Sequence, residues 1–169
     1  IQTAIDLGVN IRALQFNNEY IRTASKWGRL DMIQLLVDGG IQILDTDITY
    51  ACANAPFNII QYFFQNIAQM PGARDVVWTS VRRACERGRL KVVKFLTGRD
   101  DVPHACLEAG ASAAIQYGRL HILKFLVSMG VDVLSEDLHA VRLAADCNQF
   151  GILKYLIDLG AHKIGNSLK

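Results

Sequence analysis

Histidines, cysteines and carboxylates are the side chains that could carry chemistry in this sequence of 169 residues, and their spacing does not bring them together. The four cysteines form no Cys-x-x-Cys pair, and only Cys106 has a histidine, His104, close by in the sequence. Two potential ligands fall short of the three or four that a zinc site needs. We therefore expect no metal site, and we expect buried, unreacted thiols in the reducing interior of a cell.

Catalytic motifs are missing as well. The sequence has no Gly-x-Ser-x-Gly, no His-Glu-x-x-His, no phosphate loop ending in Gly-Lys-Ser/Thr and no Gly-x-Gly-x-x-Gly. His121 and His162 are expected on the surface, and no two carboxylates are spaced for acid–base work. The sequence thus predicts a protein that is not an enzyme and uses no cofactor.

The composition of the chain limits the classes of partner that it is expected to bind. The net charge is +2 and 51% of the residues are hydrophobic, which favours neither nucleic acid nor an anionic membrane as partner. No apolar run approaches the roughly 20 residues of a membrane helix. The opening IQTAIDLG has no basic region of the kind that begins a signal peptide. Because it also lacks an initiator Met, we expect a fragment of a longer chain.

One segment recurs along the chain. ERGRLKVVKFL at 86–96 returns as QYGRLHILKFL at 116–126. The residue in the Gly slot of Gly-Arg-Leu, here named the anchor, recurs every 27 to 33 residues in five copies, at Gly28, Ala55, Gly88, Gly118 and Asn148. Such a period indicates a stack of similar units, each burying its apolar face against its neighbours.

Each unit is expected to contain two helices. After the anchor, apolar residues at helical spacing predict a second helix with a broad buried face. Before the anchor lies a shorter first helix, whose sixth position is alanine in every copy: Ala24, Ala51, Ala84, Ala114 and Ala144. Small residues in register predict that helices approach closely there. A glycine anchor suits a left-handed turn at the end of the first helix.

Three segments give this pattern a family resemblance. LVDGG (36–40), LVSMGVDV (126–133) and LIDLGAH (156–162) resemble the Leu-x-x-x-Gly-Ala-Asp close of ankyrin repeats. The resemblance implies an all-α ankyrin-repeat solenoid that forms a single domain over 1–169. It divides the chain into a partial repeat and five full repeats, at 1–17, 18–44, 45–77, 78–107, 108–137 and 138–169.

The family's Thr-Pro-Leu-His opening is absent from every copy. YIRTAS, VRRACE and VRLAAD instead resemble the ankyrin proteins of giant DNA viruses of the mimivirus kind, which implies the host cytoplasm or the virion. The family's His slot reads Arg22, Thr49, Arg82, Ser112 and Arg142. We interpret the arginines as structural, donating to Ser/Thr hydroxyls or loop carbonyls; a row that binds anions is the alternative.

The resemblance implies a scaffold that binds another protein on its concave side, through loop tips and the two residues before each anchor (the pre-anchor positions). These positions vary while the core positions barely vary, as expected of side chains free of packing constraint. The candidate binding residues, which include one position before a first helix, are Lys26, Trp27, Asn54, Trp78, Glu86, Arg87, Gln116, Tyr117 and Asp146. Tryptophan, tyrosine and arginine are enriched among interface hot spots.

Other surfaces and functions stay open. The longer segment 65–78 is a second candidate for binding. Lys94, Lys124 and Lys154, named here the lysine stripe, are interpreted as a solvated face because the net charge is small and no aromatic residues are expected to interleave with them. A stripe that meets phosphate is the alternative. Open apolar ends favour self-association in a structural role as one alternative. A substrate adaptor of a ubiquitin ligase is another, implied by resembling viral proteins.

Overall fold

The computed structural model describes residues 19–66, 73–99, 102–134 and 139–167, and the regular structure in these ranges is entirely helical. The prediction of an all-α protein is therefore confirmed for the described part of the chain. In chain order the helices are α2 (Glu19–Lys26), α3 (Leu30–Asp38), α4 (Asp45–Asn54), α5 (Phe57–Asn66), α6 (Ala73–Glu86), α7 (Leu90–Thr97), α8 (His104–Gln116), α9 (Leu120–Ser128), α10 (His139–Asp146) and α11 (Phe150–Ser167).

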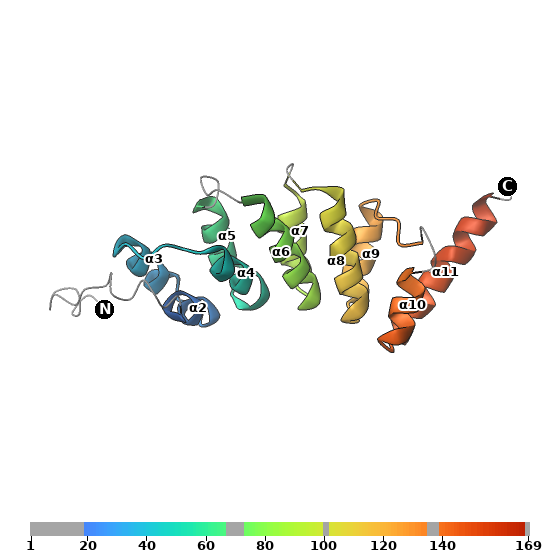
Figure 1. Ribbon diagram of the computed structural model, residues 1–169, viewed down its shortest axis with the longest axis horizontal. Coiled ribbons are helices and arrows are strands. Elements are labelled where there is room, and N and C mark those ends of the chain that lie inside the picture. Colours follow the sequence, from blue (N-terminus) through green and yellow to red (C-terminus); the bar gives the residue numbers. More distant parts are fainter. Residues whose placement is uncertain (1–18, 67–72, 100–101, 135–138, 168–169) are drawn as a thin grey trace. The chain divides into compact units, whose positions relative to one another are not determined.

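The chain forms two compact units, residues 1–76 and 77–169, and helix α6 runs from the first into the second. In the first unit, α2 pairs with α3, α4 pairs with α5, and α2 packs on α4 (Figure 1). In the second unit, α8 pairs with α9 and α10 with α11. There α8 also packs on α10, and α7 on α9. First helices therefore contact first helices, and second helices contact second helices.

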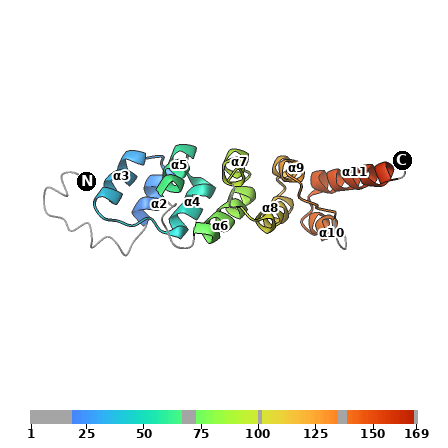
Figure 2. The same ribbon diagram turned by 90° about the horizontal axis from the view of Figure 1, so that it is seen from above.

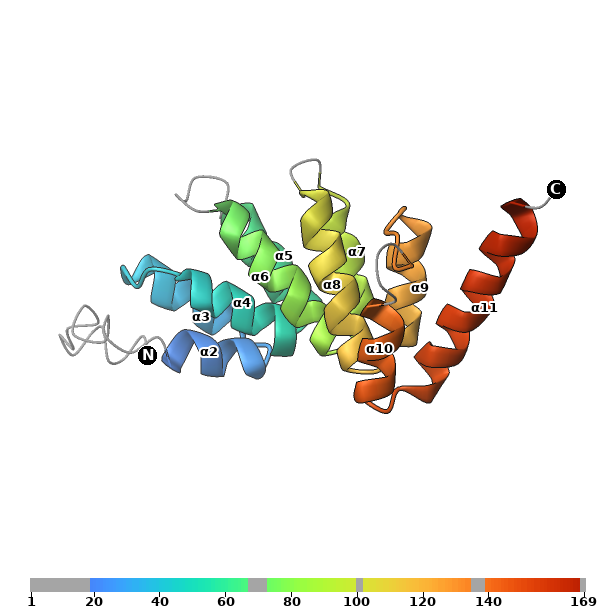
Figure 3. The same cartoon turned by 45° about the vertical axis from the view of Figure 1, so that its right-hand side comes forward.

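The second unit has two rows of helices. Figure 2 shows α7 and α9 in one row and α6, α8 and α10 in the other. Figure 3 shows α6, α8 and α10 following one another on the near side. Each row brings equivalent positions of successive copies next to each other.

The anchors adopt the backbone conformation that their sequence predicts. Gly28, Gly88 and Gly118 have φ of 71°, 74° and 70°, and Asn148 has φ of 54°. These values lie in the left-handed region, which glycine enters without strain and asparagine tolerates. Ala55 departs from this pattern, with φ −89° and ψ 157°. The next residue is Pro56, whose ring pushes the preceding residue into extended backbone.

The core coincides with the repeat positions that stay apolar. The alanine of every first helix is buried, at 0–5% exposure. One position of the second helix is buried in all five copies, at Leu36, Phe63, Leu96, Leu126 and Leu156. Gly110 in α8 shows how tight the contact between first helices is, because a Cβ there would lie 3.2 Å from Sγ of Cys85 in α6.

The turn of one copy contacts the start of the next second helix at a constant offset. Arg119 Nε donates to the Glu86 carbonyl at 3.0 Å, and Gln149 Nε2 donates to the Gln116 carbonyl at 3.3 Å. Both pairs are 33 residues apart. Within the first unit, Pro56 lies in the same relation to Gly28, with Cγ 3.1 Å from the position of an added Cβ. The same register therefore recurs in both units.

The predicted relation between helix lengths is wrong for three pairs, one of which, α4 and α5, has 10 residues in each helix. We expected a short first helix and a longer second one, but α6 has 14 residues against 8 in α7, and α8 has 13 against 9 in α9. Helix α8 begins directly after the extended Pro103, since no turn-forming residue separates His104 from Glu108. Trp78, expected just before a first helix, lies inside α6.

Candidate functional site

Most predicted binding residues have exposed side chains. Trp27 is 73% exposed, Tyr117 46% and Trp78 38%. The other exposed members of the set are Lys26, Asn54, Arg87, Gln116 and Asp146. They end first helices or lie in the turn that follows, next to buried alanines.

Glu86 differs from the other predicted binding residues. Its side chain is 5% exposed, so the prediction of freedom from packing does not hold there. Its carboxylate accepts from Arg82 Nε at 3.2 Å and from Arg83 Nη1 at 3.0 Å, one and almost one helical turn earlier. The Glu86 carboxylate is thus paired within its own helix, and its backbone carbonyl is bonded by Arg119 of the next copy. Its charge is therefore not presented to a partner.

The remaining exposed residues differ in how firmly they are held. Asn54 Nδ2 donates to the Tyr50 carbonyl at 3.0 Å, which ties it to its own helix. Lys26 Nζ lies 6.0 Å from the ring centre of Trp27. Arg87 and Tyr117 make no side-chain hydrogen bond or ion pair with the part of the chain that the structure describes. Their polar groups are free to meet a partner.

Among Arg22, Arg82 and Arg142, which were expected to donate to hydroxyls or loop carbonyls, Arg22 instead binds a carboxylate. Arg22 Nε donates to Asp47 Oδ1 at 2.9 Å, and Oδ2 of the same carboxylate accepts from the Leu44 backbone N–H at 3.0 Å. Asp47 is fully buried and lies in the first turn of α4. Arg22 therefore locks α2 to the start of α4 by neutralising a buried charge.

The two hydroxyls at the same repeat position, Thr49 and Ser112, donate hydrogen bonds to carbonyls of their own helices. Thr49 Oγ1 donates to the Asp45 carbonyl at 2.8 Å, and Ser112 Oγ to the Glu108 carbonyl at 3.2 Å. Both hydroxyls thus bond one turn back along their own helix, a habit of Ser and Thr inside helices. Arg82 is used by Glu86 within α6, and Arg142 is exposed.

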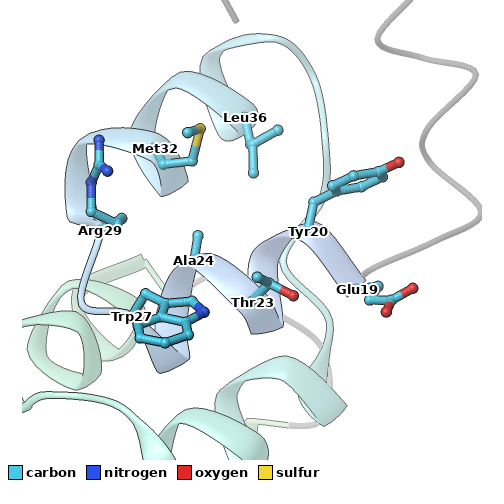
Figure 4. A pocket seen from close by; sticks show the side chains of 8 residues that line it. All are labelled: Glu19, Tyr20, Thr23, Ala24, Trp27, Arg29, Met32 and Leu36. Atoms are coloured by element: carbon cyan, nitrogen blue, oxygen red, sulfur yellow. The ribbon is translucent and has the colours of Figure 1, made fainter.

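A cavity of about 520 Å³ opens between α2 and α3 (Figure 4). Its lining residues are Glu19, Tyr20, Thr23, Ala24, Trp27, Arg29, Met32 and Leu36. Figure 4 shows Met32 and Leu36 of α3 across from Ala24 and Thr23 of α2. The lining combines apolar side chains with the aromatic Tyr20 and Trp27 and the charged Glu19 and Arg29.

Sequence reasoning found only Trp27 of this cavity. The missed signal is Met32, which is partly exposed although the same position is buried to 0–2% at Ile59, Val92, Ile122 and Ile152. At the other end of the described chain, Ala145 is exposed, whereas its equivalents Ser25, Cys52, Cys85 and Ile115 are buried to 0–2%. Positions that pack against a neighbouring copy elsewhere are therefore open in α2–α3 and in α10–α11.

The sequence predicts dispersed metal-ligating side chains and buried thiols. No three His, Cys, Asp or Glu side chains among them gather closely enough to hold a metal ion. Burial raises the pKa of the Cys85 thiol to about 12 and that of Cys106 to about 11, so both stay protonated at neutral pH. None of the described helices combines the length and hydropathy that a membrane crossing requires.

No protein-family model matches this chain, and no curated protein shows a significant match to its sequence.

Proposed function

We propose that this chain is an array of ankyrin-like helical hairpins, without enzymatic activity, that binds another protein inside the cell through exposed pre-anchor side chains. The paired helices, the left-handed anchors and the constant 33-residue contacts support the repeat assignment. Each of these features follows from units that meet only their neighbours.

One observation carries the binding role. Exposed and chemically diverse residues occupy at least one of the two pre-anchor positions in each copy, while the alanine two or three residues earlier is buried in every copy. Trp27 in the first unit, and Arg87 with Tyr117 in the second, are the residue types that contribute most to interfaces. Because folding does not need these side chains, their identities are available for recognition.

The test is affinity capture from a cell lysate with the full chain as bait. Trp27→Ala probes the first unit and Arg87→Ala/Tyr117→Ala the second, while Gln34→Ala, at an exposed position of α3, is the matched control. A protein retained by wild type and control but lost from one variant would then be purified and its Kd measured directly. We expect a loss of at least about tenfold for a hot-spot residue. Identical capture by all variants would refute binding at these positions.

Self-assembly is a second candidate function, favoured by the open positions in α2–α3 and α10–α11. Ala145 and Ile157, the latter 57% exposed, would meet the Met32 face of a second copy, since the equivalents of Ala145 and of Met32 are buried in the other copies. Contacts of this head-to-tail type generate chains of molecules.

Sedimentation velocity over a range of concentrations tests self-assembly. Thr23→Arg should block one face and Ala145→Arg the other, so each variant alone stays monomeric. A mixture of the two variants retains one intact pair of faces and should form dimers that grow no further. A wild-type protein that is monomeric at every concentration excludes this role.

A further inference from the structure

The lysine stripe is not the plain solvated face that its sequence suggested. Lys94 Nζ lies 5.4 Å from the ring centre of Phe125, and Lys124 Nζ lies 5.4 Å from that of Tyr155. Lys94 of α7 and Lys124 of α9 thus each cover an aromatic ring on the next second helix of the same unit. The expectation that no aromatic residues interleave with the lysines is wrong.

The rings hold the lysines in a fixed direction. An ammonium group within about 6 Å of a ring centre is attracted to the negative face of the ring. Burial raises the pKa of the Tyr155 phenol, so this ring stays neutral at physiological pH. Lysine side chains ordered in this way lose less conformational freedom when a partner binds.

The surroundings of the stripe are basic. Residues 77–169 contain 13 Lys and Arg against 9 Asp and Glu, whereas residues 1–76 contain 5 against 7. Neither α7 nor α9 contains a carboxylate, and α11 places one, Asp158, four residues after Lys154. The equivalent positions of the first unit are the neutral Gln34 and Gln61. The positive stripe is thus a property of the second unit.

We propose that the lysine stripe binds an acidic polypeptide segment whose carboxylates recur about every 10 Å. Packed helices lie about 8–10 Å apart, which sets the spacing of Lys94 on α7 and Lys124 on α9, and the contact of Lys124 with the Tyr155 ring brings α11 next to α9. In the polyproline II conformation, which unfolded chains readily adopt, a chain rises about 3.1 Å per residue with three residues per turn, so acidic residues at every third position face one side about 9 Å apart. This surface lies on the second helices and acts independently of the pre-anchor positions.

Single-stranded nucleic acid fits the stripe less well. Its binding sites offer open aromatic faces on which bases stack. The faces of Phe125 and Tyr155 are covered by the lysines, and the stripe contains no arginine to grip phosphate in two places. Carboxylates need only the ammonium groups, which are all exposed.

The test is fluorescence anisotropy with the full chain and a labelled peptide of Gly and Ser that carries Glu at positions 1, 4 and 7. Binding should weaken as salt is added. Lys94→Gln/Lys124→Gln/Lys154→Gln installs the residue of the first unit at each position and should raise Kd by about tenfold or more. Tyr155→Leu, which installs the residue type that Leu35 has at the same repeat position, should raise Kd about twofold to fivefold.

Three controls separate this surface from others. Trp27→Ala, which tests the pre-anchor positions, should leave Kd unchanged. A peptide with its three Glu residues adjacent should bind less tightly than the spaced one, and so should an oligothymidylate of equal charge. Equal binding of the spaced peptide by the triple Gln variant, no binding at all, or tighter binding of either control ligand would overturn the proposal.

Discussion

Replacing the anchor Gly88 with alanine should destabilise the protein by about 1–3 kcal/mol. Its φ of +74° costs a residue with a Cβ about 1–2 kcal/mol, and reduced freedom of the unfolded chain returns about 0.4–1 kcal/mol. The new Cβ would also lie 3.2 Å from Cδ of Arg119. If Arg119 moves, its bond to the Glu86 carbonyl is lost, which adds about 1 kcal/mol.

Gly151 is the matched control, because the same substitution there should have the opposite sign. It lies at the start of α11, no atom lies within 4 Å of its added Cβ, and its φ is not positive. Alanine is the better helix former by up to about 1 kcal/mol, so Gly151→Ala should stabilise by about 0.5–1 kcal/mol. The same methyl group, added at two glycines, is thus expected to lower the stability in one variant and to raise it in the other.

Urea unfolding followed by circular dichroism at 222 nm measures both variants. The comparison is valid where the slopes of free energy against urea agree with wild type. A Gly88→Ala variant as stable as wild type would refute both the left-handed anchor and the contact with the next copy. A stabilised Gly88→Ala together with a destabilised Gly151→Ala would place the two glycines in the wrong elements.

Three further predictions use buried groups. Arg22→Leu should lower the free energy of unfolding in urea by about 1–2 kcal/mol, because Asp47 is 0% exposed and would lose its charge partner. The 41% exposure of the Arg22 side chain limits the loss. An unchanged free energy of unfolding would mean that the pair contributes nothing to stability. Ser25→Ala should stabilise by about 0.5–1.5 kcal/mol, seen as a higher Tm, because the buried Ser25 hydroxyl has no hydrogen-bond partner in the described part of the chain. Thiol labelling of the native protein at neutral pH, read by mass spectrometry, should modify the partly exposed Cys147 before the buried Cys85 and Cys106. Because unfolded thiols ionise near pH 8.5 and these two only near 12 and 11, they should also make the free energy of unfolding fall as pH rises from about 9 to 12; early labelling of Cys85 would contradict its burial.

The sequence predicts the repeating core well because packing restricts it in every copy. The position that packs against a neighbouring helix is alanine in all five copies, and the anchors with left-handed backbone are Gly or Asn. The exception at Ala55 was also readable, since Pro56 excludes the left-handed turn there. Helix ends were harder, because nothing in His104–Glu108 marks a boundary between loop and helix.

The surface is predicted less well because exposure alone does not decide what a side chain contacts. Glu86 was expected to face a partner, yet Arg82 and Arg83, one turn back, draw it into an ion pair. That arrangement was readable from the i, i+4 spacing. The cavity between α2 and α3 was not readable in the same way, because Met32 fits the apolar pattern of a buried position.

The lysine stripe shows how a repeat register turns a single chain into rows of side chains. Lys94 and Phe125 are 31 residues apart, and so are Lys124 and Tyr155. In both contacts the ring belongs to the residue that directly follows the equivalent lysine of the next copy. A change from Gln to Lys at that one position, repeated over successive copies, converts a neutral row into a charged one. Since these side chains point away from the core alanines and leucines, the charge of a whole row can change without a cost in packing. The same register that fixes the core therefore leaves the surface rows free to be specialised for particular partners.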